Sequence, residues 1–147
     1  MWGACDNSIM QAVRVQHYIQ RAADFFRGMQ LTREDGTYVN SSALLAIHSA
    51  LSYNDALRVG LGDTELSSED HKSAASTTRR LLPADAEIRT GLTHLDYLIS
   101  RKSLVAYGDR RLSRDDYKLL ITKAERFAQW ANRIGSQLNI EGWRNVD

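Results

Sequence analysis

One segment of the chain, residues 42–61, is apolar on most of its circumference when it is drawn as a helix. Its apolar residues are Ala43, Leu44, Leu45, Ala46, Ile47, Ala50, Leu51, Ala56, Leu57 and Val59. A helix with one apolar stripe can lie at a surface, whereas a helix that is apolar nearly all round must be covered by other elements. The segment therefore predicts the central helix of a bundle, capped by Asn40, Ser41 or Ser42 and ended by Gly60 and Gly62.

Four further helices are expected around this segment, because their apolar residues recur at alternating spacings of three and four. We expect them at about residues 8–28, 67–82, 84–101 and 113–135. Pro83 separates the third helix of the chain from the fourth, and Gly135 is the expected end of the fifth. With one proline among 147 residues, the sequence predicts an all-α, up-and-down bundle of about five helices.

Composition and charge narrow the class of protein further. The chain is 43% apolar and 25% charged, which predicts one globular domain over residues 1–147, with fraying expected at 1–7 and 139–147. A net charge of +1 predicts no long-range attraction to nucleic acid or to an anionic membrane. The only cysteine, Cys5, excludes an internal disulfide, and the absence of a signal-type start or a long apolar run predicts a cytoplasmic protein outside the membrane.

Three polar residues interrupt the central segment. His48, Ser52 and Asp55 follow one another at spacings of four and three, so they lie on one side of the helix. Burying such groups is unfavourable unless they are hydrogen-bonded, so they need partners. A structural network with a neighbouring helix is the favoured interpretation; a polar pocket that faces a ligand or a second subunit is the alternative.

No motif in the sequence specifies a metal, a cofactor or a reaction. His48 and Asp55 are two turns apart, and neither paired cysteines nor a His-x-x-x-His motif is present, so no metal site and no cofactor are expected. His71 is expected in the first turn of the third helix as an ordinary cap-region residue. A glycine-rich phosphate loop and a hydrolase nucleophile elbow are both absent.

Basic residues gather where the fourth helix should end and the fifth begin. They are Arg101, Lys102, Arg110, Arg111 and Arg114, with Tyr107 among them. Such a cluster can hold phosphates, and an aromatic ring can stack on a base. Asp109, Asp115 and Asp116 are interleaved with them, so a solvated face that compensates its own charge is the favoured interpretation.

Residues 46–57, 68–75, 95–108 and 113–131 together resemble a HEPN-type helical domain. The resemblance implies a helical bundle that often dimerises through its motif-bearing helices. Many members of this family are RNA-cutting toxins or defence effectors, some paired with an antitoxin, whereas others are RNA-binding, nucleotide-binding or interaction modules. The active members carry an arginine followed four to six residues later by a histidine, and the residues of two subunits make a metal-independent site.

This chain departs from the motif of the active members. The expected place, residues 101–107, holds Arg101 and Tyr107 but no histidine. Arg89 and His94 have the required spacing, yet five residues at about 100° each place them about 140° apart on a regular helix. Tyrosine is a poor base near neutral pH, because its reference pKa is about 10.

The resemblance therefore implies a non-catalytic module that binds RNA, a nucleotide or a protein partner in a toxin–antitoxin, stress or defence setting. The residues expected to bind are His48, Asp55, His71, Lys102 and Tyr107, with Lys102 meeting a phosphate or pairing with Asp55. The first alternative is a dimeric metal-independent ribonuclease that uses Arg89, His94, Arg101 or Tyr107; the second is a purely structural interaction subunit. The expected partners are a second copy of the chain, RNA or a nucleotide, and an antitoxin-type or other protein.

Overall fold

The computed structural model describes residues 2–63 and 73–145, with the side chains described from Asn7 onward. In these ranges it contains α1 (Trp2–Arg33), α2 (Val39–Gly60), α3 (Ala74–Leu81), α4 (Ala86–Arg89), α5 (Leu92–Tyr107) and α6 (Arg114–Gln137). The described residues hold no strand, so the predicted all-α fold is confirmed. None of the helices described is long and apolar enough to cross a membrane.

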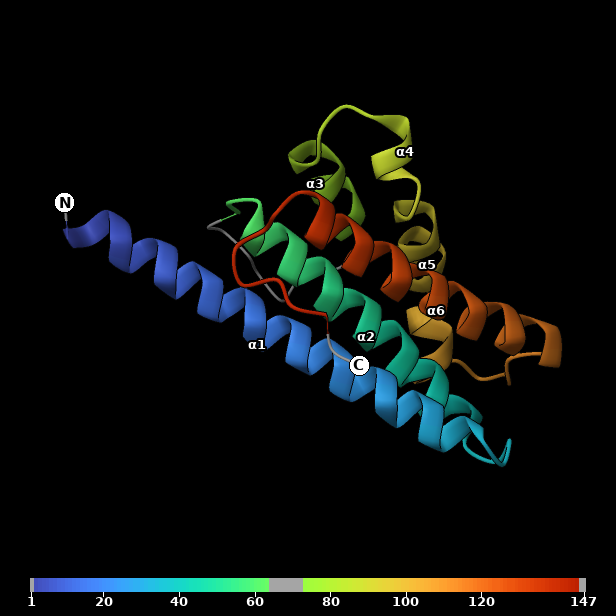
Figure 1. The fold of residues 1–147 in the computed structure, drawn as a ribbon. Helices are drawn as coiled ribbons and strands as arrows, with labels where there is room; N and C mark the ends of the chain where they lie inside the picture. Colours follow the sequence, from blue (N-terminus) through green and yellow to red (C-terminus); the bar gives the residue numbers. More distant parts are fainter. Residues whose placement is uncertain (1, 64–72, 146–147) are drawn as a thin grey trace.

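Helix α2 lies at the centre of the bundle (Figure 1). It packs against α1, α3, α5 and α6, and fourteen of its 22 residues are buried. Helices α1 and α2 form an antiparallel pair on one side, and α5 and α6 pack together on the other. The central helix predicted from its apolar circumference is therefore confirmed, and the other helices are arranged to cover it.

Helix α1 is longer than the stretch expected from its apolar stripe. It begins at Trp2 and continues to Arg33, beyond the predicted end at residue 28. Val15, Ile19 and Met29 are buried, so the predicted apolar face is confirmed. Gly28 stays helical because it lies against Leu45 of α2, and a Cβ at this position would be 3.1 Å from the Leu45 Cδ1 atom.

The single helix predicted over residues 84–101 is wrong. Asp85 caps the short helix α4, since its carboxylate accepts from the amide of Glu87 at 2.8 Å, and α5 begins only after Gly91. A Cβ at Gly91 would lie 2.1 Å from the indole of Trp130, so the ring of α6 occupies the space that a side chain would need. The Trp130 Nε1–H donates to the carbonyl of Ile88 at 2.9 Å, which fixes the ring at this break.

Two other predicted helix ends also differ from the structure. No side chain caps α2: Tyr38 is the capping residue, and Asn40 and Ser42 bond elsewhere. Ser113 does cap α6, accepting from the amide of Asp116 at 3.1 Å, but Gly135 does not end that helix. A Cβ at Gly135 would lie 2.1 Å from the Trp143 ring, so this glycine makes room for the C-terminal segment that folds back over α6.

Helix α3 is attached to the central helix by a buried polar pair. The Thr78 hydroxyl donates to the Asn54 side-chain oxygen at 2.5 Å, and the Asn54 amide donates to the carbonyl of Ala74 at 3.4 Å. Both side chains are fully buried. The helix was expected from residue 67 onward, but residues 64–72, which include the predicted Ser-x-x-Asp cap and His71, lie outside the described residues.

Candidate functional site

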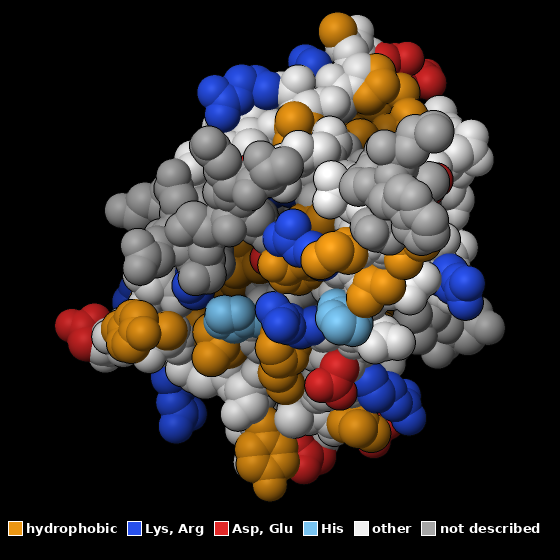
Figure 2. All heavy atoms as spheres, turned by 90° about the vertical axis from the view of Figure 1, so that its left-hand side faces the viewer, with side chains coloured by type: hydrophobic (Ala, Val, Ile, Leu, Met, Phe, Trp, Pro, Cys, Tyr) orange, Lys and Arg blue, Asp and Glu red, His pale blue; other side chains and the backbone are white. Residues whose placement is uncertain are grey.

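The polar residues of α2 that were expected to need partners face α1. The ring of His48 lies 5.9 Å from that of Phe25, and Ser52 is buried. Arg21 of α1 lies over the ring of Tyr18 at 5.4 Å, and its positive charge lowers the pKa of Asp55. Figure 2 shows basic and histidine side chains among apolar ones on the face seen from the left-hand side of Figure 1. The contacts of His48 and Asp55 with α1 favour the structural network over a ligand pocket.

Asp55 is the carboxyl group most affected by its surroundings. Burial raises its pKa to about 6, and the nearby charges of Arg58 and Arg21 only partly oppose this rise. Arg58 is itself committed to Asp63, with 2.8 Å between Nη2 and Oδ2 and both side chains about one-tenth exposed. The cations that act on Asp55 are thus Arg58 and Arg21, and not Lys102, the partner expected from the sequence.

The raised pKa of Asp55 makes a prediction about stability. A carboxyl whose pKa rises on folding contributes stability below about pH 4, and this contribution is lost as the pH rises through about 6. Asparagine mimics the protonated form. We expect Asp55→Asn to raise the free energy of unfolding by on the order of 2 kcal/mol at pH 8, with the gain disappearing near pH 4.

Urea unfolding of both proteins between pH 4 and pH 8 measures the difference. Asp24→Asn, at an exposed position of α1, is the matched control and should change stability by less than about 0.5 kcal/mol throughout. A variant less stable than the parent at pH 8 would show instead that the charge of Asp55 stabilises the fold.

The residues of the ribonuclease alternative are not assembled into one site. The Arg89 guanidinium donates to the carbonyls of Pro83 and Leu82, both at 3.0 Å, and so ties α4 to the end of α3. His94 lies on α5, where burial and the charges of Lys123 and Arg126 lower its pKa. The guanidinium of Arg89 is therefore hydrogen-bonded to backbone carbonyls, whereas the charged groups near His94 are Lys123 and Arg126 of α6.

The remaining predicted residues of α5 have different surroundings. Tyr107 is 88% exposed at the last position of the helix, and Lys102 is half-buried. Arg101 lies over the ring of Tyr97 at 5.1 Å, and its Nε atom is buried without a hydrogen-bond partner. Among the described residues, no group of three or more His, Cys, Asp or Glu side chains is arranged to hold a metal ion.

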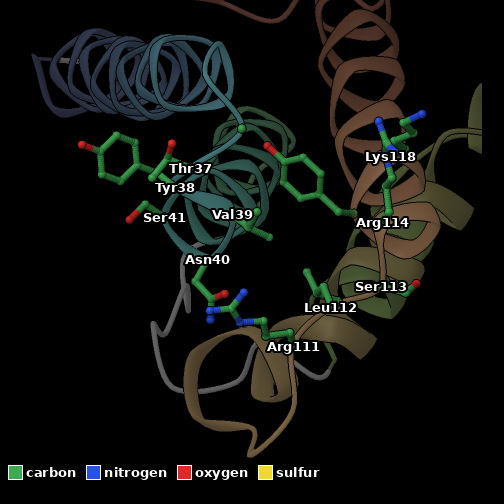
Figure 3. A pocket seen from close by; sticks show the side chains of 12 residues that line it. Thr37, Tyr38, Val39, Asn40, Ser41, Arg111, Leu112, Ser113, Arg114 and Lys118 are labelled. Carbon is green, nitrogen blue, oxygen red and sulfur yellow. The ribbon is translucent and has the colours of Figure 1, made fainter.

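A hollow lies between the start of α2 and the start of α6 (Figure 3). It has a volume of about 690 Å³, within the range of small-ligand sites. Its lining consists of Gly36, Thr37, Tyr38, Val39, Asn40, Ser41, Arg111, Leu112, Ser113, Arg114, Tyr117 and Lys118. We call this feature the α2–α6 hollow. Two segments that are far apart in the chain, residues 36–41 and 111–118, form it together.

The charged side chains that line the α2–α6 hollow are all positive. Arg111, Arg114 and Lys118 line it, and no acidic residue of the described part of the chain does. All three cations are exposed, and none takes part in an ion pair within the described part of the chain. The interleaved aspartates that predicted a self-compensating surface are absent from the lining; one of them, Asp116, instead lies in the capped first turn of α6.

Hydrogen bonds fix the walls of the hollow. The Asn40 side-chain amide donates to the carbonyl of Val105 at 2.9 Å, and the hydroxyls of Ser42 and Tyr117 are 2.7 Å apart. Figure 3 shows Arg111 extending toward Asn40, with Arg114 and Lys118 across the opening. The start of α2 therefore holds one wall and the start of α6 holds the other.

The backbone of α2 adds to the positive character of the hollow. The first amides of a helix have no acceptor within the helix, and they carry part of its positive dipole. In α2 no side chain accepts from them, and residues 39–41 belong to the lining. Such a turn beside three cations is suited to an anion such as a phosphate.

The lining also limits what chemistry the hollow can perform. It contains no His, Asp, Glu or Cys, the side chains that most often act as general bases or nucleophiles. Val39, Leu112 and Tyr117 give it an apolar part beside the cations. The arrangement supports binding of an anion that carries an apolar or aromatic body.

Comparisons of the chain with family models, with curated proteins and with solved structures found no significant match. The assignment of a function therefore depends on the geometry of the chain itself. Sequence reasoning singled out Arg111 and Arg114 but missed Lys118 and the wall from residues 36–41. One signal was present, since Arg114 and Lys118 are four residues apart and so lie on one face of the predicted helix.

Proposed function

We propose that this chain is a non-catalytic module that binds RNA or a nucleotide through a phosphate held in the α2–α6 hollow. The observation that carries the proposal is the lining, which has three exposed cations, the uncapped first turn of a helix and no carboxylate. Phosphate oxygens accept charge-assisted hydrogen bonds from arginine and lysine, and backbone amides at a helix start add further donors. The apolar part around Leu112 and Tyr117 supports a ligand that carries a base.

The biological setting is part of the same proposal. The resemblance of residues 46–57, 68–75, 95–108 and 113–131 to HEPN-type domains suggests a toxin–antitoxin, stress or defence role. It also suggests a homodimer, which sedimentation equilibrium of the purified chain would measure. The helical bundle is compatible with this assignment and does not by itself select it.

Direct binding tests the proposal. The probes are a short 5′-phosphorylated oligoadenylate, the same oligomer with a 5′-hydroxyl, and ATP, each measured by calorimetry at about 100 mM salt. We expect at least one phosphorylated probe to bind, and we expect the Arg111→Ala, Lys118→Ala double variant to bind it at least about 20-fold more weakly. This factor corresponds to about 1 kcal/mol for each lost cation.

The matched control removes two other exposed cations. Arg110 is the direct neighbour of Arg111 but does not line the hollow, and Arg80 lies on α3. The Arg110→Ala, Arg80→Ala variant loses the same charge and should bind within about twofold of the parent. Equal losses in the two double variants would show that binding depends on net charge and not on the hollow, and no binding of any probe would refute the proposal.

A ribonuclease remains a second candidate because of one observation at α5. The pKa of His94 is lowered by burial and by Lys123 and Arg126, so its imidazole is neutral at pH 7 and can accept a proton. The test is incubation with a mixed RNA pool without metal, beside His94→Ala. Cleavage that this substitution abolishes would establish the enzyme, whereas no cleavage supports the binding module.

A further inference from the structure

A second cationic surface lies on the other side of α6, and the α2–α6 hollow does not include it. It consists of His94, Tyr97 and Arg101 of α5 with Lys123 and Arg126 of α6, and we call it the α5–α6 face. The two helices pack side by side (Figure 1). Lys123 and Arg126 both act on His94, and Arg101 lies two helical turns from His94 on the same side of α5.

Hydrogen bonding on this face is incomplete. Three polar atoms are buried and have no partner among the described residues: Nδ1 of His94, the hydroxyl of Tyr97 and Nε of Arg101. Most buried polar atoms in folded proteins are paired, so three orphans on one face of one helix are unusual. The arginine nitrogen can only donate and the tyrosine hydroxyl can donate, and the nearby groups from α6 are cations. The face therefore lacks acceptors.

The acids of the two helices do not supply these acceptors. Asp96 of α5 pairs with Arg79 of α3 at 3.4 Å, and Glu125 of α6 pairs with Arg33 of α1 at 3.2 Å. Arg101, Lys123 and Arg126 take part in no ion pair within the described residues. Negative charge from outside the described residues would complete the face.

We propose that the α5–α6 face binds an acidic amphipathic segment of a partner protein. Carboxylates on successive turns of a helix match the charged ends of Arg101, Lys123 and Arg126, which have no ion-pair partner among the described residues. Leu119 lies one turn before Lys123 and is 42% exposed, so the face also offers an apolar contact. Such mixed surfaces are typical of helix-in-groove recognition.

The same features make RNA a poorer occupant of this face. The ring of Tyr97 is covered by the Arg101 guanidinium at 5.1 Å, so it does not present an open surface for base stacking. The chain carries a net charge of only +1, which gives a long polyanion little attraction beyond a local contact. A short segment with both carboxylates and apolar side chains uses all parts of the face.

Peptide binding tests this inference. The probe is a labelled helical peptide of about 15 residues with glutamates along one side and leucines beside them, compared with the same peptide carrying glutamines. We expect the acidic peptide to bind at least about tenfold more tightly than its glutamine analogue. Lys123→Glu with Arg126→Glu should weaken its binding at least tenfold, whereas Arg14→Glu with Arg80→Glu, at exposed positions elsewhere, should leave it within about threefold.

A second readout reports the location of binding. A carboxylate close to His94 favours its charged form, so the imidazole titration followed by NMR should move to higher pH when the acidic peptide is bound. Equal binding of the two peptides, unchanged binding by the charge-reversal variant, or an unmoved His94 titration would each overturn the proposal. The proposal would also be overturned if an oligoadenylate displaced the acidic peptide, since the α5–α6 face would then be a nucleic-acid site.

Discussion

Replacing Gly91 with alanine is expected to lower the free energy of unfolding by about 3 kcal/mol. The new Cβ would lie 2.1 Å from the Trp130 ring. This ring cannot easily move away, because its Nε1–H donates to the carbonyl of Ile88 and the ring is buried in the core. Overpacking a rigid site typically costs 1–3 kcal/mol, and the lost hydrogen bond adds about 1 kcal/mol. Urea unfolding, followed by tryptophan fluorescence, measures the change.

Gly28→Ala is the matched control for this substitution. Gly28 lies inside α1, and Gly91 has helical dihedral angles at the start of α5, but the new Cβ at Gly28 would be 3.1 Å from the end of the flexible Leu45 side chain. Alanine favours a helix by about 1 kcal/mol over glycine, so this variant should keep or gain stability. A Gly91→Ala protein as stable as Gly28→Ala would show that the break between α4 and α5 does not depend on Trp130.

Phe127→Ala is expected to lower the free energy of unfolding by about 4 kcal/mol. Phe127 is fully buried on α6, the helix that packs against both α2 and α5, and its ring lies 5.3 Å from that of Trp130. Removing a large core side chain costs 3–5 kcal/mol, because the transfer free energy is lost and a cavity remains.

Phe127→Leu separates the size of the side chain from its aromatic contact. Leucine keeps most of the volume, so we expect a loss below about 1.5 kcal/mol in the same unfolding experiment. Equal, small losses for alanine and leucine would contradict the position of Phe127 in the core between α2, α5 and α6.

The apolar pattern predicted the elements whose packing follows from their own residues. The circumference of residues 42–61 identified α2 as the central helix, and the stripe through Val15 and Ile19 identified the buried face of α1. The ends that were wrong depend on residues far along the chain. Trp130 explains the break at Gly91, and Trp143 explains why α6 passes through Gly135. Local propensity contains no information about either ring.

The candidate site was predictable only in part, because its two walls come from segments that are distant in the sequence. The cluster of Arg111 and Arg114 was visible in the sequence, but its aspartates made it look self-compensating. Whether those acids line the same hollow as the cations depends on how the start of α6 packs against the start of α2, and Asp109, Asp115 and Asp116 do not line it. In the other wall, at residues 36–41, Asn40 and Ser41 were predicted as possible caps of α2, whereas the Asn40 side chain donates to the carbonyl of Val105 of α5 instead.

Amide chemical-shift mapping tests the central claim most directly. A 5′-phosphorylated oligoadenylate or ATP is titrated into the isotope-labelled chain, and the shifts are assigned along the sequence. If the ligand binds in the α2–α6 hollow, the largest chemical-shift changes should fall both on residues 36–41 and on residues 111–118, two segments that are far apart in the sequence. Changes confined to α5 and the middle of α6, or no changes at all, would contradict the proposed site.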